Sequence, residues 1–118
     1  MEYNNADTID MSPIPSGSGN VLEKWQELVL FKLYPGYNKI MGPYSVKGSN
    51  GRLILTMYNS HLPAIDKRRN RTCVYARAVA ESYLGEIIPQ STTVDHIDRN
   101  FFNNSPENLA LLDRATHT

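Results

Sequence analysis

Residues 93–118 read TVDHIDRNFFNNSPENLALLDRATHT, which is the most strongly patterned stretch of this chain of 118 residues. Its first apolar residues predict a short strand that leads into Asp95 and His96. Residues 109–112 predict a second, returning strand, and the loop between them is rich in Asn, a residue that favours turns. We therefore expect an antiparallel pair of strands with an acidic and an imidazole side chain at the start of the loop.

The end of the same stretch predicts a helix. Asp113 stands where a helix N-cap belongs, so residues 115–118 would open a final helix. Two strands packed against a helix can bring Asp95 and His117 together on one side. His96 would then face elsewhere, because neighbouring residues of an extended strand point to opposite sides.

These side chains fit the hydrolysis of a phosphodiester bond. A nucleophile must be made from water, and the leaving 3′ oxygen must be stabilised as negative charge develops on it. His96 can accept a proton from water near neutral pH, because an ordinary imidazole titrates near pH ~6.5. Asp95 and His117 offer an oxygen and a nitrogen ligand to a divalent cation, which leaves most of its coordination sphere to water and the phosphate.

The residues that form the pattern are Asp95-His96-Ile97-Asp98, Asn100, Asn103-Asn104, Pro106-Glu107-Asn108-Leu109 and His117. This spacing resembles the HNH nuclease motif in its phage and homing-endonuclease form, and a looser similarity extends upstream to about residue 42. The resemblance implies that Asp95 and His117 bind one divalent ion, Mg²⁺ or Mn²⁺, with Zn²⁺ as a substitute in crystals. It also implies that His96 is the general base, and that Asn108 ties the two strands together and orients His96.

The chain departs from this motif at two positions. Family members commonly carry Gly where this chain has Arg99, so the backbone there either avoids a positive φ or accepts a strained turn. Arg99 is also a candidate phosphate contact. His117 is the penultimate residue of the sequence, and a helix of about one turn is marginal in water. Weak metal binding, completion of the site by a second chain, and low activity are all open.

The middle of the chain is basic, although the net charge of the whole chain is zero. Residues 39–71 hold seven Lys or Arg against one Asp, a net charge of +6, and the two flanking segments are each −3. Asn50-Gly51 between two apolar runs predicts a hairpin over 42–58. We expect the basic side chains of this hairpin and of a polar loop over 59–72 to form one patch that contacts DNA phosphates. They are Lys47, Arg52, Lys67, Arg68, Arg69 and Arg71.

The N-terminal third carries one predicted helix. Residues 1–20 hold Pro, Gly and polar residues without an apolar period, and we expect a disordered arm there. The helix is predicted over 21–33, with Asn20 and Glu23 as its capping signal. Trp25 lies on its apolar stripe and is expected to be a core residue.

A second helix is predicted over 73–84, with Thr72 as its N-cap and Gly85 as its end. Its helical period leaves Arg77 and Glu81 facing outward. The residues of its buried stripe would be Val74, Ala78, Val79 and Tyr83.

Composition excludes several classes of protein. No run approaches the ~18 apolar residues that a membrane span needs, and the N-terminus lacks the basic start of an export signal. The single cysteine, Cys73, can form neither an internal disulfide nor a zinc knuckle alone, and we expect it to be a buried residue at the start of a helix, without chemistry. A cytoplasmic protein without a membrane partner is the expectation.

Together the patterns predict a small α+β domain with an N-terminal helix, a β-hairpin, a central helix and a C-terminal ββα-metal unit. The expected divisions are an arm over 1–20, a helix and linker over 21–41, and a nuclease domain over 42–118, made of a basic hairpin and loop over 42–72, the central helix over 73–84 and the motif over 93–118. The predicted activity is metal-dependent cleavage of DNA, in which a monomer would nick one strand and a homodimer could cut both. Two alternatives stay open: a DNA-binding or host-interaction module that keeps the nuclease skeleton without its activity, and an RNA-directed nuclease.

Overall fold

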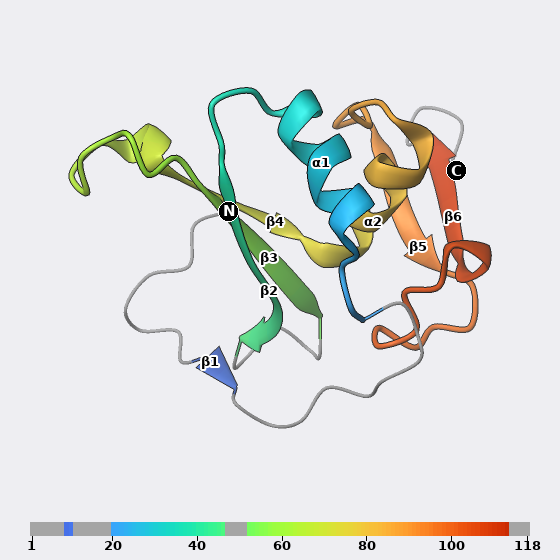
Figure 1. The fold of residues 1–118 in the computed structure, drawn as a ribbon. Coiled ribbons are helices and arrows are strands. Elements are labelled where there is room, and N and C mark those ends of the chain that lie inside the picture. The colour runs from blue at the N-terminus through green and yellow to red at the C-terminus, as the bar shows by residue number, and fades with distance from the viewer. Residues whose placement is uncertain (1–8, 11–19, 47–51, 114–118) are drawn as a thin grey trace.

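The computed structural model describes residues 9–10, 20–46 and 52–113. The described residues form two helices that pack side by side, with a four-stranded antiparallel sheet on one side and a two-stranded sheet beyond the second helix (Figure 1). The elements are β1 (Ile9–Asp10), α1 (Lys24–Leu33), β2 (Lys39–Val46), β3 (Leu53–Tyr58), the 3₁₀ turn η1 (Lys67–Arg69), β4 (Asn70–Val74), α2 (Tyr75–Leu84), β5 (Thr92–His96), the 3₁₀ turn η2 (Pro106–Asn108) and β6 (Leu109–Asp113). The predicted α+β class is confirmed. Neither described helix is long and apolar enough to cross a membrane.

β2 and β3 form the predicted hairpin. They pair antiparallel, with Lys39 opposite Tyr58 and Ser45 opposite Leu53. The turn over 47–51, which contains Lys47 and the predicted Asn-Gly pair, lies outside the described residues. All of β3 from Leu53 to Met57 is buried, so this strand is covered on both faces and needs a hydrogen-bonding neighbour on each edge.

β4 is the second neighbour of β3, and it corrects the prediction of a polar loop over 59–72. Ile54 lies opposite Val74, and Tyr58 lies opposite Asn70. Because β4 is an edge strand with a largely exposed surface, no apolar alternation marks it in the sequence. Thr72 therefore lies within a strand, and its prediction as a helix N-cap is wrong.

The N-terminal segment also departs from the expected disorder where the structure describes it. Ile9 and Asp10 pair antiparallel with Val46 and Ser45 of β2. Asn20, at the end of the predicted arm, is only 6% exposed. The remaining residues of this segment lie outside the described ones.

The core lies between β3 and the two helices. Every second residue of β3 points toward the helices, because side chains alternate along a strand. The side chains of this cluster, all at most 2% exposed, are Leu30, Leu53, Leu55, Met57, Tyr75, Ala78 and Val79.

α1 exists as predicted, but its start and its buried face differ. Its N-cap is Glu23, whose backbone N–H donates to Oε1 of Gln26 at 2.9 Å. Trp25 is 41% exposed and stands edge-on against Tyr83, so its prediction as a core residue is wrong. The buried positions are Gln26 and Leu30. An apolar period does not mark Gln26 as buried, because Gln is polar. Its amide can be buried because its Nε2 donates to the hydroxyl of Ser82 in α2, at 3.2 Å.

α2 begins at Tyr75 after an extended N-cap at Val74, two residues later than predicted. Its predicted end is confirmed, since Gly85 adopts the left-handed conformation at φ 73°. Val74 and Tyr83 of the predicted buried stripe are 37% and 53% exposed, whereas Ala78 and Val79 are buried as expected.

Glu81 and Arg77 of α2 do not face outward. Glu81 is 3% exposed and accepts hydrogen bonds from the Tyr34 hydroxyl, at 2.6 Å, and from the backbone N–H of Ile88, at 3.0 Å. Burial and this hydrogen bond raise the pKa of Tyr34. The guanidinium of Arg77 donates to the backbone carbonyls of Ile88 and Thr92. These two side chains therefore fix the connection between α2 and β5.

Candidate functional site

β5 and β6 are the two strands predicted for the motif, and they pair antiparallel with His96 opposite Leu109. Asp95 is exposed and lies opposite Ala110 of β6. His96, the last residue of β5, is half-buried. The two candidate side chains are thus presented at the mouth of the loop over 97–108, as the sequence predicted.

Asn108 joins the two ends of that loop. Its Nδ2 donates to Oδ1 of Asp98 at 2.9 Å and to the carbonyl of Asn103 at 2.8 Å. The side-chain Oδ1 of Asn108 accepts from the backbone N–H of Asp98. The backbone carbonyl of Asn108 accepts from the backbone N–H of Ile97. Because Ile97 directly follows His96, these bonds restrain the backbone that carries the imidazole.

The carboxylate of Asp98 is the second centre of the loop. It accepts from Nδ2 of Asn103 and from the backbone N–H of Asn100, each at 2.8 Å. These bonds and that from Asn108 stabilise the ionised form, so they hold the pKa of Asp98 below its ordinary value. Asn100 and Asn103 therefore act as turn-forming residues, as expected.

The sequence left open whether the backbone at Arg99 avoids a positive φ or accepts a strained turn. Its φ is 63°, in the left-handed region that glycine adopts most readily, so the loop accepts a strained turn at this position. The side chain of Arg99 lines the cavity described below.

Asn104 is a functional candidate that sequence reasoning treated only as a turn former. It is 1% exposed, and its Oδ1 lies 2.8 Å from Nε2 of His96. Its Nδ2 donates to Oδ1 of Asn20 at 2.7 Å and to the carbonyl of Phe101 at 3.2 Å. The Asn-Asn pair of the motif was a signal for this residue, but Asn20 is 84 residues away, and its local pattern indicated only a helix cap, a role that Glu23 has instead.

An open cavity of about 480 Å³ lies between the β5–β6 pair and the segment where β4 meets α2. Asp95, His96, Arg99 and Arg52 all line it. The guanidinium of Arg52 stands 5.2 Å above the ring of Phe101, which in turn meets His96 edge-on at 5.5 Å. A carboxylate, an imidazole and two guanidinium groups thus share one opening. The expectation that His96 faces a different side from Asp95 is therefore not met, since His96 is the last residue of β5 and both residues line the same cavity.

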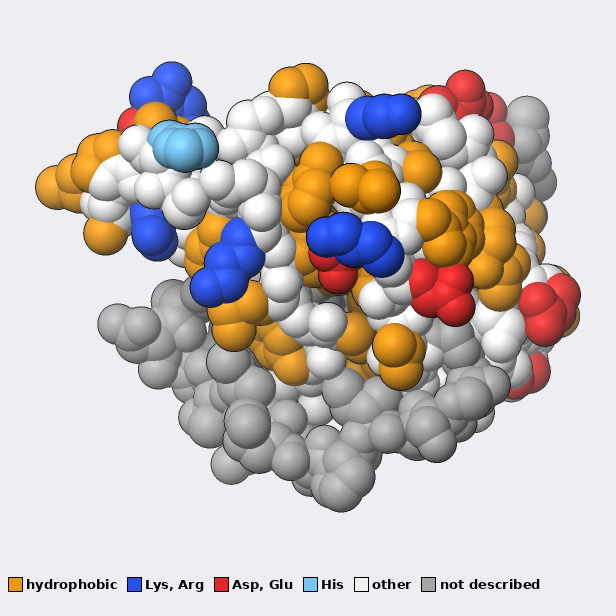
Figure 2. Space-filling view, viewed as in Figure 1, with side chains coloured by type: hydrophobic (Ala, Val, Ile, Leu, Met, Phe, Trp, Pro, Cys, Tyr) orange, Lys and Arg blue, Asp and Glu red, His pale blue; other side chains and the backbone are white. Residues whose placement is uncertain are grey.

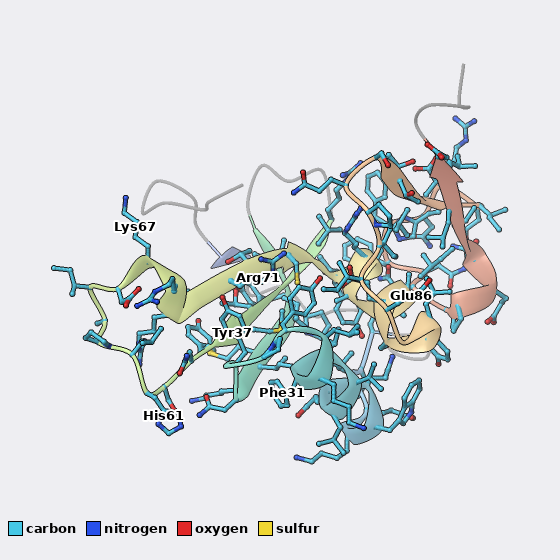
Figure 3. The ribbon with its side chains drawn as sticks, turned by 90° about the horizontal axis from the view of Figure 1, so that it is seen from above. Phe31, Tyr37, His61, Lys67, Arg71 and Glu86 are labelled. Carbon is cyan, nitrogen blue, oxygen red and sulfur yellow. The ribbon has the colours of Figure 1, made fainter. Side chains whose placement is uncertain are left out.

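The basic candidates of residues 67–71 lie elsewhere, which corrects the prediction that they form one patch with Arg52. Tyr58 pairs with Asn70, so η1 lies beyond the end of β3 that is opposite to Arg52. Figures 1 and 3 show the loop between β3 and β4 projecting from the body, with Lys67 and His61 on it. Basic side chains gather on this projection in Figure 2. The antiparallel course of the chain separates residues that the sequence presents as one block.

Within this projection the basic side chains have different surroundings. Arg68 forms an ion pair with Asp66 at 2.7 Å, and this bond lowers the pKa of Asp66 to about 2. Arg69 donates to the carbonyl of Leu62 at 3.0 Å. Arg71, farther along β4, stacks over the ring of Tyr34 at 4.6 Å. Lys67 is exposed and is the best placed of the group to meet a ligand.

The sequence predicted a metal ion held by Asp95 and His117. Among the residues that the structure describes, no group of three or more His, Cys, Asp or Glu could hold a metal ion, and His117 lies outside them.

Cys73 is half-buried in β4, and burial raises the pKa of its thiol to about 12. A thiol with a raised pKa is protonated at neutral pH, which agrees with the expected lack of chemistry. Its expected place at the start of a helix is wrong, since Cys73 lies in β4.

Comparison with known proteins identifies the segment that contains this site. Residues 76–118, about a third of the chain, match the family model described as HNH endonuclease. The match starts in α2 and includes β5, the loop and β6. No curated protein and no solved structure matches the chain.

Proposed function

We propose that the protein is a metal-dependent endonuclease that hydrolyses phosphodiester bonds in DNA, because residues 76–118 match the family model described as HNH endonuclease. The observation that supports this proposal best is the cavity lined by Asp95, His96, Arg52 and Arg99. It combines a ligand for a hard cation, a proton acceptor and two anion-binding groups, which are the parts that phosphodiester hydrolysis needs.

Asp95 and His117 are the proposed ligands of one divalent ion, Mg²⁺ or Mn²⁺. An exposed carboxylate beside an open cavity suits these ions, which prefer oxygen ligands and keep water and substrate in their coordination sphere. When bound, the ion would supply positive charge to the leaving oxygen of the phosphodiester.

His96 is the proposed general base. It takes a proton from water, the resulting hydroxide attacks the phosphorus in line, and the bond from phosphorus to the 3′ oxygen breaks. The products are a 5′-phosphate and, after protonation of the leaving oxygen, a 3′-hydroxyl. The hydrogen bonds of Asn108 to the loop keep the backbone next to His96 from moving during this step.

Binding of DNA is proposed to use basic residues at two places. Arg52 and Arg99 lie at the cavity, where the guanidinium groups can hold the phosphates on either side of the bond that breaks. Lys67 and its neighbours on the projecting loop are proposed as a more distant contact to the DNA backbone. With one such site, a monomer would nick one strand, and a homodimer could cut both.

The first test is cleavage of supercoiled plasmid by the full chain in Mg²⁺ or Mn²⁺, with EDTA as the metal-free control. His96→Ala should lower the rate about 10²- to 10⁴-fold, because it removes the proton acceptor. It should leave DNA affinity, measured by fluorescence anisotropy, nearly unchanged. His61→Ala is the matched control for the cleavage rate, since it removes an exposed imidazole far from the cavity and keeps every basic side chain of the projecting loop.

The outcomes of this test separate the alternatives. Full activity of His96→Ala would rule out His96 as the base. Tight DNA binding by the wild-type chain without cleavage in either ion would support a DNA-binding module that lacks activity. Cleavage of a matched RNA but not of DNA would support an RNA-directed nuclease.

A further inference from the structure

The side-chain contact of His96 raises a question of proton position. A neutral imidazole carries one proton, on Nδ1 or on Nε2, and only the other nitrogen can accept a proton. Nε2 lies 2.8 Å from the side chain of Asn104, and the described residues offer the ring no other hydrogen bond. Which nitrogen is the base therefore depends on whether Asn104 presents its oxygen or its NH₂ group to the ring.

Two backbone carbonyls decide the orientation of the amides. The carbonyl of Phe102 can only accept, and it lies 2.7 Å from the amide of Asn20, so the NH₂ group of Asn20 must face it. The oxygen of Asn20 then faces Asn104 at 2.7 Å. The carbonyl of Phe101, at 3.2 Å from the same end of Asn104, is a second acceptor.

Asn104 consequently turns its NH₂ group toward two acceptors and its oxygen toward His96. The reverse orientation would place the Asn104 oxygen against those two oxygens. That arrangement is costly here, because Asn104 is 1% and Asn20 6% exposed, and water cannot substitute for the lost donors. The oxygen of Asn104 needs a donor, so the proton of the neutral imidazole belongs on Nε2.

We propose that Asn104, held by Asn20, is a positioning residue that keeps His96 in the form protonated on Nε2. Nδ1 is then the nitrogen that accepts the proton from water. The last step rests on the proposed nuclease function, whereas the position of the proton does not. Asn20 lies outside the matched segment 76–118, so a residue from the N-terminal part of the chain controls the site.

The proton position can be measured without DNA or metal. The full chain labelled with ¹⁵N is examined by NMR above pH 7.5, with correlations between ring nitrogens and ring protons that distinguish the two neutral forms. The three histidines are assigned by the spectra of His61→Ala and His96→Ala. We expect His96 to carry its proton on Nε2, with slow exchange of this proton with water. A proton on Nδ1 of His96 would overturn the proposal.

Variants then test whether the contact matters for catalysis. Asn104→Leu has a similar volume but no acceptor, and it should lower the cleavage rate about 10- to 100-fold, which is the usual effect of losing a residue that orients a reacting group. Asn104→Asp keeps an oxygen opposite Nε2 but turns its second oxygen toward the oxygens of Asn20 and Phe101. It should therefore unfold at a lower temperature than the wild type, while retaining more of the cleavage rate than Asn104→Leu. A carboxylate stabilises the imidazolium, which cannot act as the base. As the pH is lowered, the rate of Asn104→Asp should therefore begin to fall at a higher pH than the rate of the wild type. A structural role alone would produce neither the rescue nor the shift.

Asn20→Ala is the milder variant, because it leaves the motif intact and removes only the support of Asn104. It should speed exchange of the Nε2 proton and lower the cleavage rate about tenfold or less. Asn38→Ala is the control, since this exposed amide bonds Ser60 away from the site. Each variant is checked for folding by thermal unfolding. Unchanged proton exchange and rate in both Asn20→Ala and Asn104→Leu would overturn the proposal.

The two proposals fail in different ways. If the wild-type chain never cleaves nucleic acid but His96 carries its proton on Nε2, the nuclease function fails and the assignment of the proton stands. If the chain cleaves DNA and His96 carries its proton on Nδ1, the assignment of the proton fails and the nuclease function stands.

Discussion

Arg99 combines a strained backbone with a side chain at the cavity, and the two properties can be separated by substitution. At φ 63° a residue with a Cβ atom is less stable than glycine by about 1 kcal/mol. We predict that Arg99→Gly unfolds at a higher urea concentration than Arg99→Ala, by about 1 kcal/mol in the free energy of unfolding.

Both Arg99 variants lack the guanidinium, so both should bind DNA equally weakly relative to the wild type. Equilibrium unfolding in urea and fluorescence anisotropy measure the two effects on the same samples. Equal stability of the Gly and Ala variants would contradict the account of strain. Wild-type affinity in both variants would contradict the proposed phosphate contact.

Single residues of the motif were predictable where their role is local. The strand that carries Asp95 and His96, and the turn-forming role of Asn100 and Asn103, depend on neighbours within a few residues. The role of Asn104 could not be predicted in the same way, because its amide is oriented by Asn20, 84 residues earlier in the chain.

At the level of elements, one buried carboxylate joins the end of α1, α2 and the segment between α2 and β5. Glu81 of α2 receives the hydroxyl of Tyr34 and the backbone N–H of Ile88. We predict that Glu81→Ala lowers the free energy of unfolding by about 1–3 kcal/mol, because it leaves buried donors without a partner.

Unfolding in urea followed by circular dichroism measures this loss. Glu86→Ala is the matched control, because Glu86 is exposed just after α2 and should change stability little. Equal stability of both variants would show that the hydrogen bonds of Glu81 do not stabilise the packing of these elements.

The helices illustrate what periodicity can predict. Both helices and the left-handed end of α2 at Gly85 were expected from local signals. Their buried faces were not, because Gln26 and Glu81 are buried through hydrogen bonds between elements, while Trp25 stays 41% exposed. A hydrophobic period treats every polar residue as solvent-facing and cannot detect such partners.

At the scale of the whole molecule, Arg52 and Lys67, two of the basic residues proposed to contact DNA, lie beyond opposite ends of β3. β3 has six residues, so Arg52 and Lys67 are about 20 Å apart along the strand direction. This distance corresponds to roughly six base pairs of DNA at ~3.4 Å each. If both ends touch one duplex, contact by Lys67 requires DNA that extends about that far past the cleavage site.

We predict that Lys67→Ala lowers affinity for a long duplex and reduces the slope of log affinity against log salt by about 0.9, the value for one phosphate contact. On a duplex too short to reach Lys67, the variant and the wild type should bind alike. Lys32→Ala, on α1, is the control and should leave the slope unchanged. An unchanged slope for Lys67→Ala on long DNA would remove the projecting loop from the proposed interface.

Local order along the chain was sufficient for the β2–β3 hairpin, the two strands of the motif, the C-terminal ends of both helices and the position of Asp95 and His96 at the end of a strand. Turns, caps and strand pairs between neighbouring segments depend on residues close in sequence, and such patterns can be read directly. Three features arose only when distant segments packed together: the edge strand β4, the pairing of Asn20 with Asn104, and the separation of Lys67 from Arg52. Each depends on which segments become neighbours in space, and burial and hydrogen bonding between those segments then set the environment of every side chain.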